Sequence, residues 1–202
     1  MKIYEDRVAP NPRRVRIFLA EKKIDVPYVN VQIMKKENRT SEFLQKNASG
    51  LLPVLELGDG SHISESVAIC RYFEEMQPEP SLFGKTAKER ALVEMWQRKM
   101  ELELFLPLAQ TFRNTHVFWK GRIPQVAEYG EICREASTKR LAQLDKELEG
   151  RPFIAGENYS IADITALVAV DFGRISNIRV QEGQKNLARW HQSVSSRPSA
   201  KA

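Results

Sequence analysis

The chain has 202 residues, of which 42% are hydrophobic and 28% charged, and its formal net charge is +5. These values are ordinary for a soluble globular protein that folds as one large domain or two small ones. No stretch approaches the roughly 18 uncharged apolar residues of a membrane span, and the start M-K-I-Y-E-D-R lacks the apolar core of a signal peptide, so we expect a cytoplasmic protein without membrane contact.

The first part of the chain alternates short strands and short helices. The predicted elements are a strand at 2–5, a helix at 12–23, a strand at 27–33, a helical turn at 41–46, strands at 53–57 and 61–64, and a helix at 67–76. Asn11 is a preferred N-cap residue and Pro12 suits the first helical position, so the first helix has a strong start signal. Gly58-Asp59-Gly60 predicts a hairpin between the last two strands. This βαβαββα order is typical of a small mixed sheet with helices on both faces.

After two closely spaced prolines, Pro78 and Pro80, the hydrophobic residues recur at the spacing of a helix. T-A-K-E at 86–89 has the form of a capping box and opens a helix that we expect to run beyond residue 110 with a kink at Pro107. Further helices are predicted at about 125–149, from Ser160 onward, and around Leu187, Trp190 and Val194. The sequence therefore predicts an α/β domain at 1–78, a linker at 79–85 and an all-helical domain at 86–202.

The residues suited to metals, redox chemistry and nucleic acids are sparse or scattered. The two cysteines, Cys70 and Cys133, form no C-x-x-C motif and are expected to be buried, and the three histidines form no metal-binding pattern. Residues 1–83 hold 12 basic and 12 acidic residues, so the excess positive charge belongs to the helical part, where it is interspersed. This disfavours a nucleic-acid surface and fits a small anionic ligand.

Three stretches carry a resemblance to a known family. They are R-R-V-R-I-F-L-A-E-K (13–22), N-A-S-G-L-L-P-V-L-E-L with S-E-S-V-A-I (47–57 and 64–69), and R-P-F-I-A-G-E-N-Y-S-I-A-D-I (151–164). Together with the domain order, they resemble the cytosolic glutathione S-transferase superfamily. E-F-L-x-K-N-x-S-G, P-V-L-E-L and M-E-L-E-L are similar to bacterial and fungal transferases of the Gtt2 type. The resemblance implies a thioredoxin-like domain followed by a helical domain.

The resemblance also implies the partners. Glutathione is expected as a co-substrate, with no metal or other cofactor. The second substrate is expected to be a small electrophile. A homodimer is expected, in which the first domain packs on the long helix of the partner.

Five residues match the family's glutathione-binding positions. The resemblance implies a cis peptide bond before Pro53, so that the backbone of Leu52 pairs with glutathione like a short extra strand. Ser66 and the helix that follows it are expected to hold the γ-glutamyl carboxylate, with Glu65 near the ammonium group. Arg39 stands where many relatives carry a lysine for the glycyl carboxylate. Each of three residues also has a purely structural interpretation. Pro53 could simply open a strand, Ser66 could simply cap a helix, and Arg39 could be a solvated surface cation.

The catalytic position departs from the usual family pattern. Aligned on R-R-V, the position of the usual Ser or Cys holds Ala9, which disfavours a mixed disulfide with glutathione and removes the usual hydroxyl donor. Asn11 remains, because A-P-N resembles the T-P-N turn of bacterial nu-class transferases. Its side-chain amide and the helix start are expected to stabilise the thiolate. Tyr4 lies inside the first strand and is interpreted as a core residue.

The second-substrate pocket is expected between the domains, with Phe105, Phe112, His116 and Trp119 as candidate lining residues. A core or dimer role for these aromatics, and a packing role for His116, are the competing interpretations. Asp163 completes an S-x-x-D capping box, so we expect it to organise the helical domain without touching substrate.

Two functions remain open at this stage. One is a glutathione transferase that conjugates electrophiles or reduces peroxides or disulfides with glutathione. The other is a non-catalytic glutathione or ligand-binding module of the same fold. Ala9 is the feature that separates them.

Overall fold

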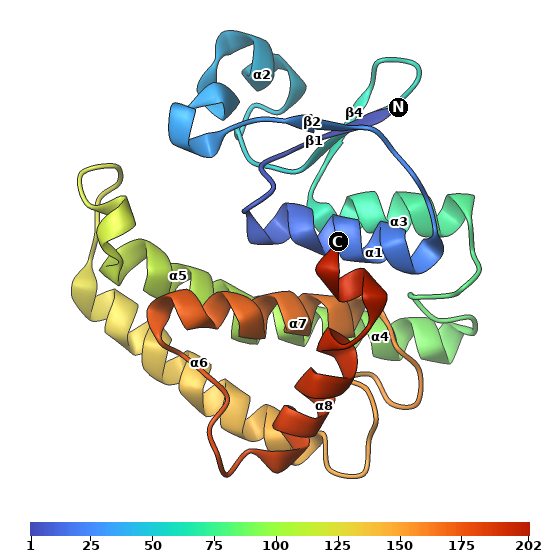
Figure 1. Cartoon of the computed structure of the whole chain (residues 1–202), viewed down its shortest axis with the longest axis vertical. Coiled ribbons are helices and arrows are strands. Elements are labelled where there is room, and N and C mark those ends of the chain that lie inside the picture. The colour runs from blue at the N-terminus through green and yellow to red at the C-terminus, as the bar shows by residue number, and fades with distance from the viewer. The chain divides into compact units, whose positions relative to one another are not determined.

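The computed structural model describes residues 1–202 and divides into two compact units. Unit 1 comprises residues 1–82 and 198–202, and unit 2 comprises residues 83–197. Figure 1 shows the elements of both units along the chain. The last five residues therefore pack with the α/β part, where their 3-10 turn, Pro198–Lys201, lies against the first helix. The predicted domains at 1–78 and 86–202, with a linker at 79–85, stay a prediction.

Unit 1 is a four-stranded mixed sheet with helices on both faces. Its elements are β1 (Lys2–Glu5), α1 (Pro10–Lys22), β2 (Tyr28–Asn30), α2 (Ser41–Lys46), β3 (Val54–Glu56), β4 (His62–Ser64) and α3 (Ser66–Met76). The strand order is β2-β1-β3-β4, in which only the β1–β2 pair is parallel. The fold class predicted for this part is confirmed.

The alternation of side chains along β1 and β3 explains the two layers. Tyr4 and Val54 are paired across the strands and belong to a cluster with Phe43 of α2. The neighbouring pair, Ile3 and Leu55, is fully buried and points to the opposite face, because successive strand residues alternate. Figure 1 shows α1 and α3 side by side along that face, with α2 beyond the other.

Two of the three helix starts in unit 1, those of α1 and α3, differ from the prediction. Helix α1 begins at Pro10 with Ala9 as its N-cap, so Asn11 lies in the first turn and is not the cap. A proline is tolerated there because the N–H that it lacks would have no helical partner. Helix α3 begins at Ser66 with Glu65 as its N-cap, so Ser66 is the first helical residue rather than the cap. Strand β2 is also shorter than the predicted 27–33.

Unit 2 is all-helical, as predicted. Its helices are α4 (Ala87–Lys99), α5 (Leu106–Thr115), α6 (Ala127–Glu147), α7 (Ile161–Gly173) and α8 (Lys185–Ser195), and 3-10 turns span Val117–Trp119 and Arg174–Ser176. The capping boxes at Thr86 and Ser160 are both present. Helix α7 is buried along most of its length and forms the core of the unit.

A kink was predicted at Pro107. The structure has a π-helical segment, Met100–Phe105, just before this proline and between α4 and α5. Pro107 has no N–H to offer the carbonyl four residues earlier, and the N–H of Leu106 bonds to the carbonyl of Glu101, five residues back. The irregularity therefore lies on the N-terminal side of the proline and not at the proline itself.

Candidate functional site

The strand register of unit 1 gathers the predicted glutathione residues at one edge of the sheet. Tyr4 is paired with Val54, and Val54 with Ser64. The end of β1, the start of β3 and the end of β4 therefore lie next to one another. Three segments adjoin these strand ends. The loop into α1 follows β1, the Leu52-Pro53 pair precedes β3, and the Glu65-Ser66 pair follows β4. This edge is the candidate site.

The N-terminus of α3 provides a group of unpaired donors at this edge. The N–H of Ile69 bonds to the carbonyl of Glu65 at 2.9 Å, whereas those of Ser66, Val67 and Ala68 have no protein partner. Glu65 is exposed and adopts φ 67° and ψ 114°, a conformation that non-glycine residues seldom adopt. Unpaired N–H groups and the positive end of the helix form a site for an anion.

Ser66 is held by a buried arginine that the sequence reasoning did not identify. Arg14 is 1% exposed, and its Nη1 donates to Oγ of Ser66 over 2.7 Å. Because Ser66 accepts this bond, its own hydroxyl proton remains available for an acceptor at the helix end. The sequence carries one signal of this role, because Arg14, Phe18 and Lys22 follow one another at intervals of four and therefore share one face of the helix. In the structure all three side chains are fully buried.

The N-terminus of α1 offers fewer donors than its position suggests. Pro10 and Pro12 have no N–H, and the N–H of Arg13 bonds to the carbonyl of Ala9 at 3.3 Å. The backbone N–H of Asn11 is therefore the only unpaired one in the first turn. The side-chain Oδ1 of Asn11 is buried without a hydrogen-bond partner, and no group in the chain bonds its Nδ2. The backbone N–H and the side-chain Nδ2 of Asn11 thus remain available to a ligand.

The Leu52-Pro53 peptide bond is cis. The side chain of Leu52 is buried in the cluster with Tyr4 and Phe43, yet its backbone N–H and C=O make no hydrogen bond in the chain. Buried chain segments normally have these groups paired. The free N–H and C=O of Leu52 are therefore suited to pair with an extended peptide, as an additional strand would.

Arg39 lies in a 3-10 turn, Glu37–Arg39, and is exposed. Its Nη1 donates to the carbonyl of Ser49 at 2.8 Å, which fixes it beside the segment that leads to Leu52. Gly50 has φ 63°, and a Cβ at this position would lie 2.7 Å from Nη1 of Arg39. The glycine therefore permits the close approach that positions the guanidinium.

The four aromatic candidates belong to one cluster in unit 2. The ring of Phe112 lies 4.8 Å from that of His116 and 6.0 Å from that of Trp119, and Phe105 joins through Phe172. Nδ1 of His116 accepts from the N–H of Phe118 at 3.2 Å, so this histidine also caps the turn Val117–Trp119. The sequence reasoning missed Phe172, which comes from α7. A role of these residues toward a second substrate stays a prediction.

Tyr4 has the structural surroundings expected for a core residue. It is 7% exposed, its ring packs edge-on against Phe43, and its hydroxyl donates to Oε2 of Glu56 at 2.6 Å. This hydrogen bond lowers the pKa of Glu56 to about 2. The phenol is thus already engaged with a carboxylate.

Asp163 accepts four hydrogen bonds inside unit 2. Its donors are the N–H of Ile154, the N–H and hydroxyl of Ser160, and Nε1 of Trp190, at 2.8 to 3.1 Å. Burial raises its pKa to about 6, against the effect of these bonds. The carboxylate links the loop before α7 to α8.

Both cysteines are free and buried, and burial raises the pKa of Cys70 far above its usual range. No group of three or more His, Cys, Asp or Glu side chains is arranged to hold a metal ion. None of the helices has the length and apolar character needed to cross a membrane.

Comparisons with known proteins cover both units. The family model described as "Glutathione S-transferase, N-terminal domain" matches residues 8–76, and the one described as "Glutathione S-transferase, C-terminal domain" matches residues 104–198. The chain is 37% identical over 208 residues to Glutathione S-transferase 2 of Saccharomyces cerevisiae, with coverage of 100% of this chain and 88% of that protein.

Solved structures give the same result. The crystal structure of Gtt2 from Saccharomyces cerevisiae matches with a TM-score of 0.94 and 36% identity, over 100% of this chain and 99% of that one. A class Gtt2 transferase of Vibrio parahaemolyticus matches with a TM-score of 0.89 and 37% identity, over 100% and 96% of the two chains. The predicted resemblance is confirmed, including its Gtt2-type character.

Proposed function

Because the chain belongs to the glutathione S-transferase family, we propose that it activates the thiol of glutathione for conjugation to small electrophiles. The observation that carries this proposal is the N-terminus of α3. It combines three unpaired N–H groups with a serine hydroxyl held by a buried arginine. Such a cluster of unpaired donors at the positive end of a helix is suited to bind an anion.

Each part of glutathione has a complementary group at the edge of the sheet. The γ-glutamyl carboxylate accepts from Ser66 and the first N–H groups of α3, and the exposed carboxylate of Glu65 pairs with the ammonium group. The cysteinyl backbone pairs with the N–H and C=O of Leu52, which have no partner in the chain. Arg39 binds the glycyl carboxylate, for which a guanidinium provides a two-pronged donor.

The thiol of the cysteinyl residue then lies toward the first turn of α1. A free thiol has a pKa of about 8.5, so only a few per cent is ionised at pH 7. Donors that bond the thiolate more strongly than the thiol lower this pKa. Asn11 supplies two of them, its backbone N–H and its side-chain Nδ2, and the positive end of α1 adds to the effect.

The thiolate attacks the electrophilic carbon of the second substrate, forms the C–S bond and expels the leaving group or saturates the electrophile. The thiol proton leaves to solvent. The same thiolate would serve in the reduction of peroxides or disulfides with a second glutathione as reductant. Neither reaction requires a protein thiol, and the buried Cys70 and Cys133 provide none at the surface.

The test compares Ser66→Ala with Ser41→Ala. Both serines are the first residue of a helix, but Ser41 is exposed and lies on α2. We expect Ser66→Ala to weaken glutathione binding about tenfold, as measured by calorimetry, because a charge-assisted hydrogen bond contributes about 1.5–3 kcal/mol. Ser41→Ala should bind as the unchanged protein does. Equal affinity of all three proteins would contradict the proposed site.

Activity is tested separately from binding. The protein should be retained on immobilised glutathione and should conjugate a general electrophile or turn over cumene hydroperoxide. Retention without any turnover would replace the transferase by the binding module as the function. Absence of both retention and a thermal shift with glutathione would contradict both functions.

A further inference from the structure

Asp6 is a buried carboxylate beside the turn that is proposed to meet the thiol of glutathione. It is 8% exposed and forms no ion pair, so backbone N–H groups are its only partners. Oδ1 accepts from the N–H of Val8 at 3.3 Å, and Oδ2 accepts from the N–H of Ile33 at 2.9 Å. The other two buried carboxylates of unit 1, Glu5 and Glu74, each pair with a cation. Burial of a charge without a counter-ion is costly, which sets Asp6 apart from them.

The bond to Val8 fixes the turn between β1 and α1. The carbonyl of Asp6 accepts from the N–H of Ala9 at 3.0 Å, so residues 6–9 form a β-turn whose first side chain bonds two residues ahead. Ala9 is the N-cap of α1, and Asn11 lies in the first turn of that helix. Asp6 therefore determines where the donors of Asn11 lie relative to the end of β1.

The bond to Ile33 fixes the segment that carries Arg39. Ile33 begins one 3-10 turn, and Arg39 ends the next one along the chain. The N–H of Gln32 donates to Oε2 of Glu37 at 2.7 Å, which joins the starts of these two turns. A movement of Ile33 relative to β1 would therefore also shift the guanidinium of Arg39, because the two turns are tied together.

We propose that Asp6 is a positioning residue for the reaction of glutathione. One oxygen of its carboxylate holds the turn that meets the sulfur, and the other holds the segment that binds the glycyl carboxylate. A single side chain thus sets the spacing between these two parts of the site. The negative charge of Asp6 would oppose a nearby thiolate, so its benefit comes from geometry and not from its field. This role rests on the proposed glutathione site, and Asp6 itself does not touch the substrate.

Asp6→Ala and Asp6→Ser separate the two bonds. Alanine removes both, whereas a serine hydroxyl still accepts from the N–H two residues ahead but offers a single oxygen on a shorter side chain, which leaves Ile33 without a partner. We expect Asp6→Ala to raise the pKa of the bound glutathione thiol by at least about half a pH unit, because the donors of Asn11 lose their position. Asp6→Ser should keep the pKa of the unchanged protein. Ultraviolet absorbance of the thiolate as a function of pH measures this pKa.

Two outcomes of this titration would overturn the proposal. One is an equal thiol pKa in Asp6→Ala and the unchanged protein. The other is an equal fall of the thiol pKa in both variants, which loss of the negative charge alone would cause. A purely structural role of Asp6 would lower the melting temperature of the variants and leave the thiol pKa of the folded protein unchanged.

The second readout is the preference for the glycyl carboxylate. Calorimetry compares glutathione with its C-terminal amide, in which this group is neutral. The unchanged protein should bind glutathione about tenfold more tightly than the amide, because the bond to Arg39 is charge-assisted. Both Asp6 variants should reduce this preference to about threefold or less, since both release Ile33. An undiminished preference in both variants would overturn the link between the two parts of the site.

Asp59→Ala is the matched control. Asp59 also accepts from an N–H two residues ahead, that of Ser61 at 2.9 Å, but it lies in the hairpin at the opposite end of β3 and β4. It should change neither readout. If the unchanged protein does not bind glutathione, the proposed function fails together with the role of Asp6. If the unchanged protein binds and ionises glutathione and Asp6→Ala does so equally, only the role of Asp6 fails.

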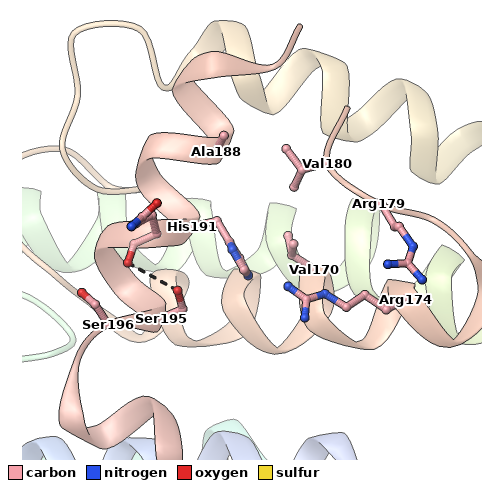
Figure 2. A pocket seen from close by; sticks show the side chains of 9 residues that line it. Val170, Arg174, Arg179, Val180, Ala188, His191, Ser195 and Ser196 are labelled. Atoms are coloured by element: carbon pink, nitrogen blue, oxygen red, sulfur yellow. Dashed lines mark hydrogen bonds between the residues drawn. The ribbon is translucent and has the colours of Figure 1, made fainter. Parts of the chain in front are cut away.

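A control in unit 2 tests whether the readouts report glutathione held elsewhere. Figure 2 shows Ser195 in a pocket of about 470 Å³ between α7 and α8. Its hydroxyl bonds to the carbonyl of Gln192 at 3.3 Å, within its own helix. Ser195→Ala should bind glutathione as the unchanged protein does, with the same thiol pKa. Changes as large as those of Asp6→Ala would overturn the assignment to Asp6.

Discussion

Asn11 carries the catalytic hypothesis because the first turn of α1 has little else to offer. Ala9 contributes no polar side chain, and Pro10 and Pro12 contribute no N–H. The helix dipole arises from unpaired N–H groups, so a turn with two prolines has a weaker positive end than an ordinary one. The side chain of Asn11 then has a larger share in stabilising a thiolate than the start of a helix alone would suggest.

Asn11→Ala should raise the pKa of the bound glutathione thiol by about one pH unit, because it removes one hydrogen bond to the charged form. The measurement is the ultraviolet absorbance of the thiolate as a function of pH. Asn186→Ala is a matched control, because Asn186 is also the second residue of its helix, α8 in unit 2. The same titration curve for Asn11→Ala and the unchanged protein would remove the side chain from the mechanism.

The candidate site could be predicted only in part from the sequence. Leu52-Pro53 and Glu65-Ser66 are adjacent pairs in recognisable motifs, so they were identified together with their place at a strand end. Arg14 was missed because its importance depends on a contact across 52 positions, with Ser66. Asn11 was identified but assigned to the cap, because a strong N-cap preference does not reveal that a proline before it can already begin the helix.

At the scale of elements, an ion pair links the ends of α1 and α3. Nζ of Lys22 lies 2.5 Å from Oε2 of Glu74 and donates to the carbonyls of Gln77 and Pro80 at 2.6 and 2.8 Å. Oε1 of Glu74 accepts from the N–H of Leu82 at 3.0 Å. The pair therefore also fixes the segment at 77–82 that leaves α3.

Glu74→Gln should destabilise the protein by about 3 kcal/mol. It leaves the ammonium group of Lys22, whose side chain is 0% exposed, without its buried counter-charge. The two carbonyls still accept from Lys22, which keeps the loss at the low end of the range for broken buried pairs. Denaturant unfolding measures it, and Glu75→Gln, on the exposed side of α3, is the control. A loss below about 1 kcal/mol would show that the pair does not stabilise the fold.

Asp163 makes the stability of unit 2 depend on pH. Burial raises its pKa from 3.8 to about 6. In the unfolded chain it releases its proton near pH 4, so between pH 4 and 6 the folded state binds more protons than the unfolded one. Its contribution to stability is therefore fully present below the unfolded pKa of 3.8 and is lost as the pH rises through the folded pKa of about 6.

Asp163→Asn should remove this dependence. Over pH 4 to 6 the unfolding free energy of the unchanged protein should fall by about 2 kcal/mol relative to the variant. The variant should be less stable at every pH, because an amide cannot accept all four hydrogen bonds. Urea unfolding at a series of pH values tests this, and a parallel pH dependence of the two proteins would contradict the raised pKa.

For the whole molecule, the division into an α/β part and a helical part was predictable, because the spacing of hydrophobic residues along the chain differs between the two parts. Strands and short helices alternate up to about residue 77, and helical spacing follows. Two features were not predictable. The π-helical segment at 100–105 depends on how the chain relieves the missing N–H of Pro107, and the return of residues 198–201 to α1 is a long-range contact. Neither has a local periodic signal.

The assembly of the molecule is the remaining question at this scale, and we propose that it is a homodimer. An apolar stripe remains exposed along the segment from α4 to α5. Leu92, Met95, Leu102 and Leu106 are 38–46% exposed and recur at helical spacing within each part of the segment. Exposed apolar side chains that gather in this way are typical of protein contacts, whereas single ones are common on any surface. Relatives in this family commonly form dimers.

Met95→Lys should therefore shift the protein toward the monomer of 23.2 kDa. Methionine and lysine have similar helix propensities, so α4 itself should persist. Burying an unpaired ammonium group in a contact is costly, and the dimer should dissociate at a concentration at least tenfold higher than for the unchanged protein. Light scattering after size exclusion measures the mass. Val117→Lys places the same charge on a 75% exposed valine outside the stripe and should leave the mass unchanged. A monomeric unchanged protein at micromolar concentration, or equal dissociation of Met95→Lys and Val117→Lys, would show that this stripe is not a contact between copies.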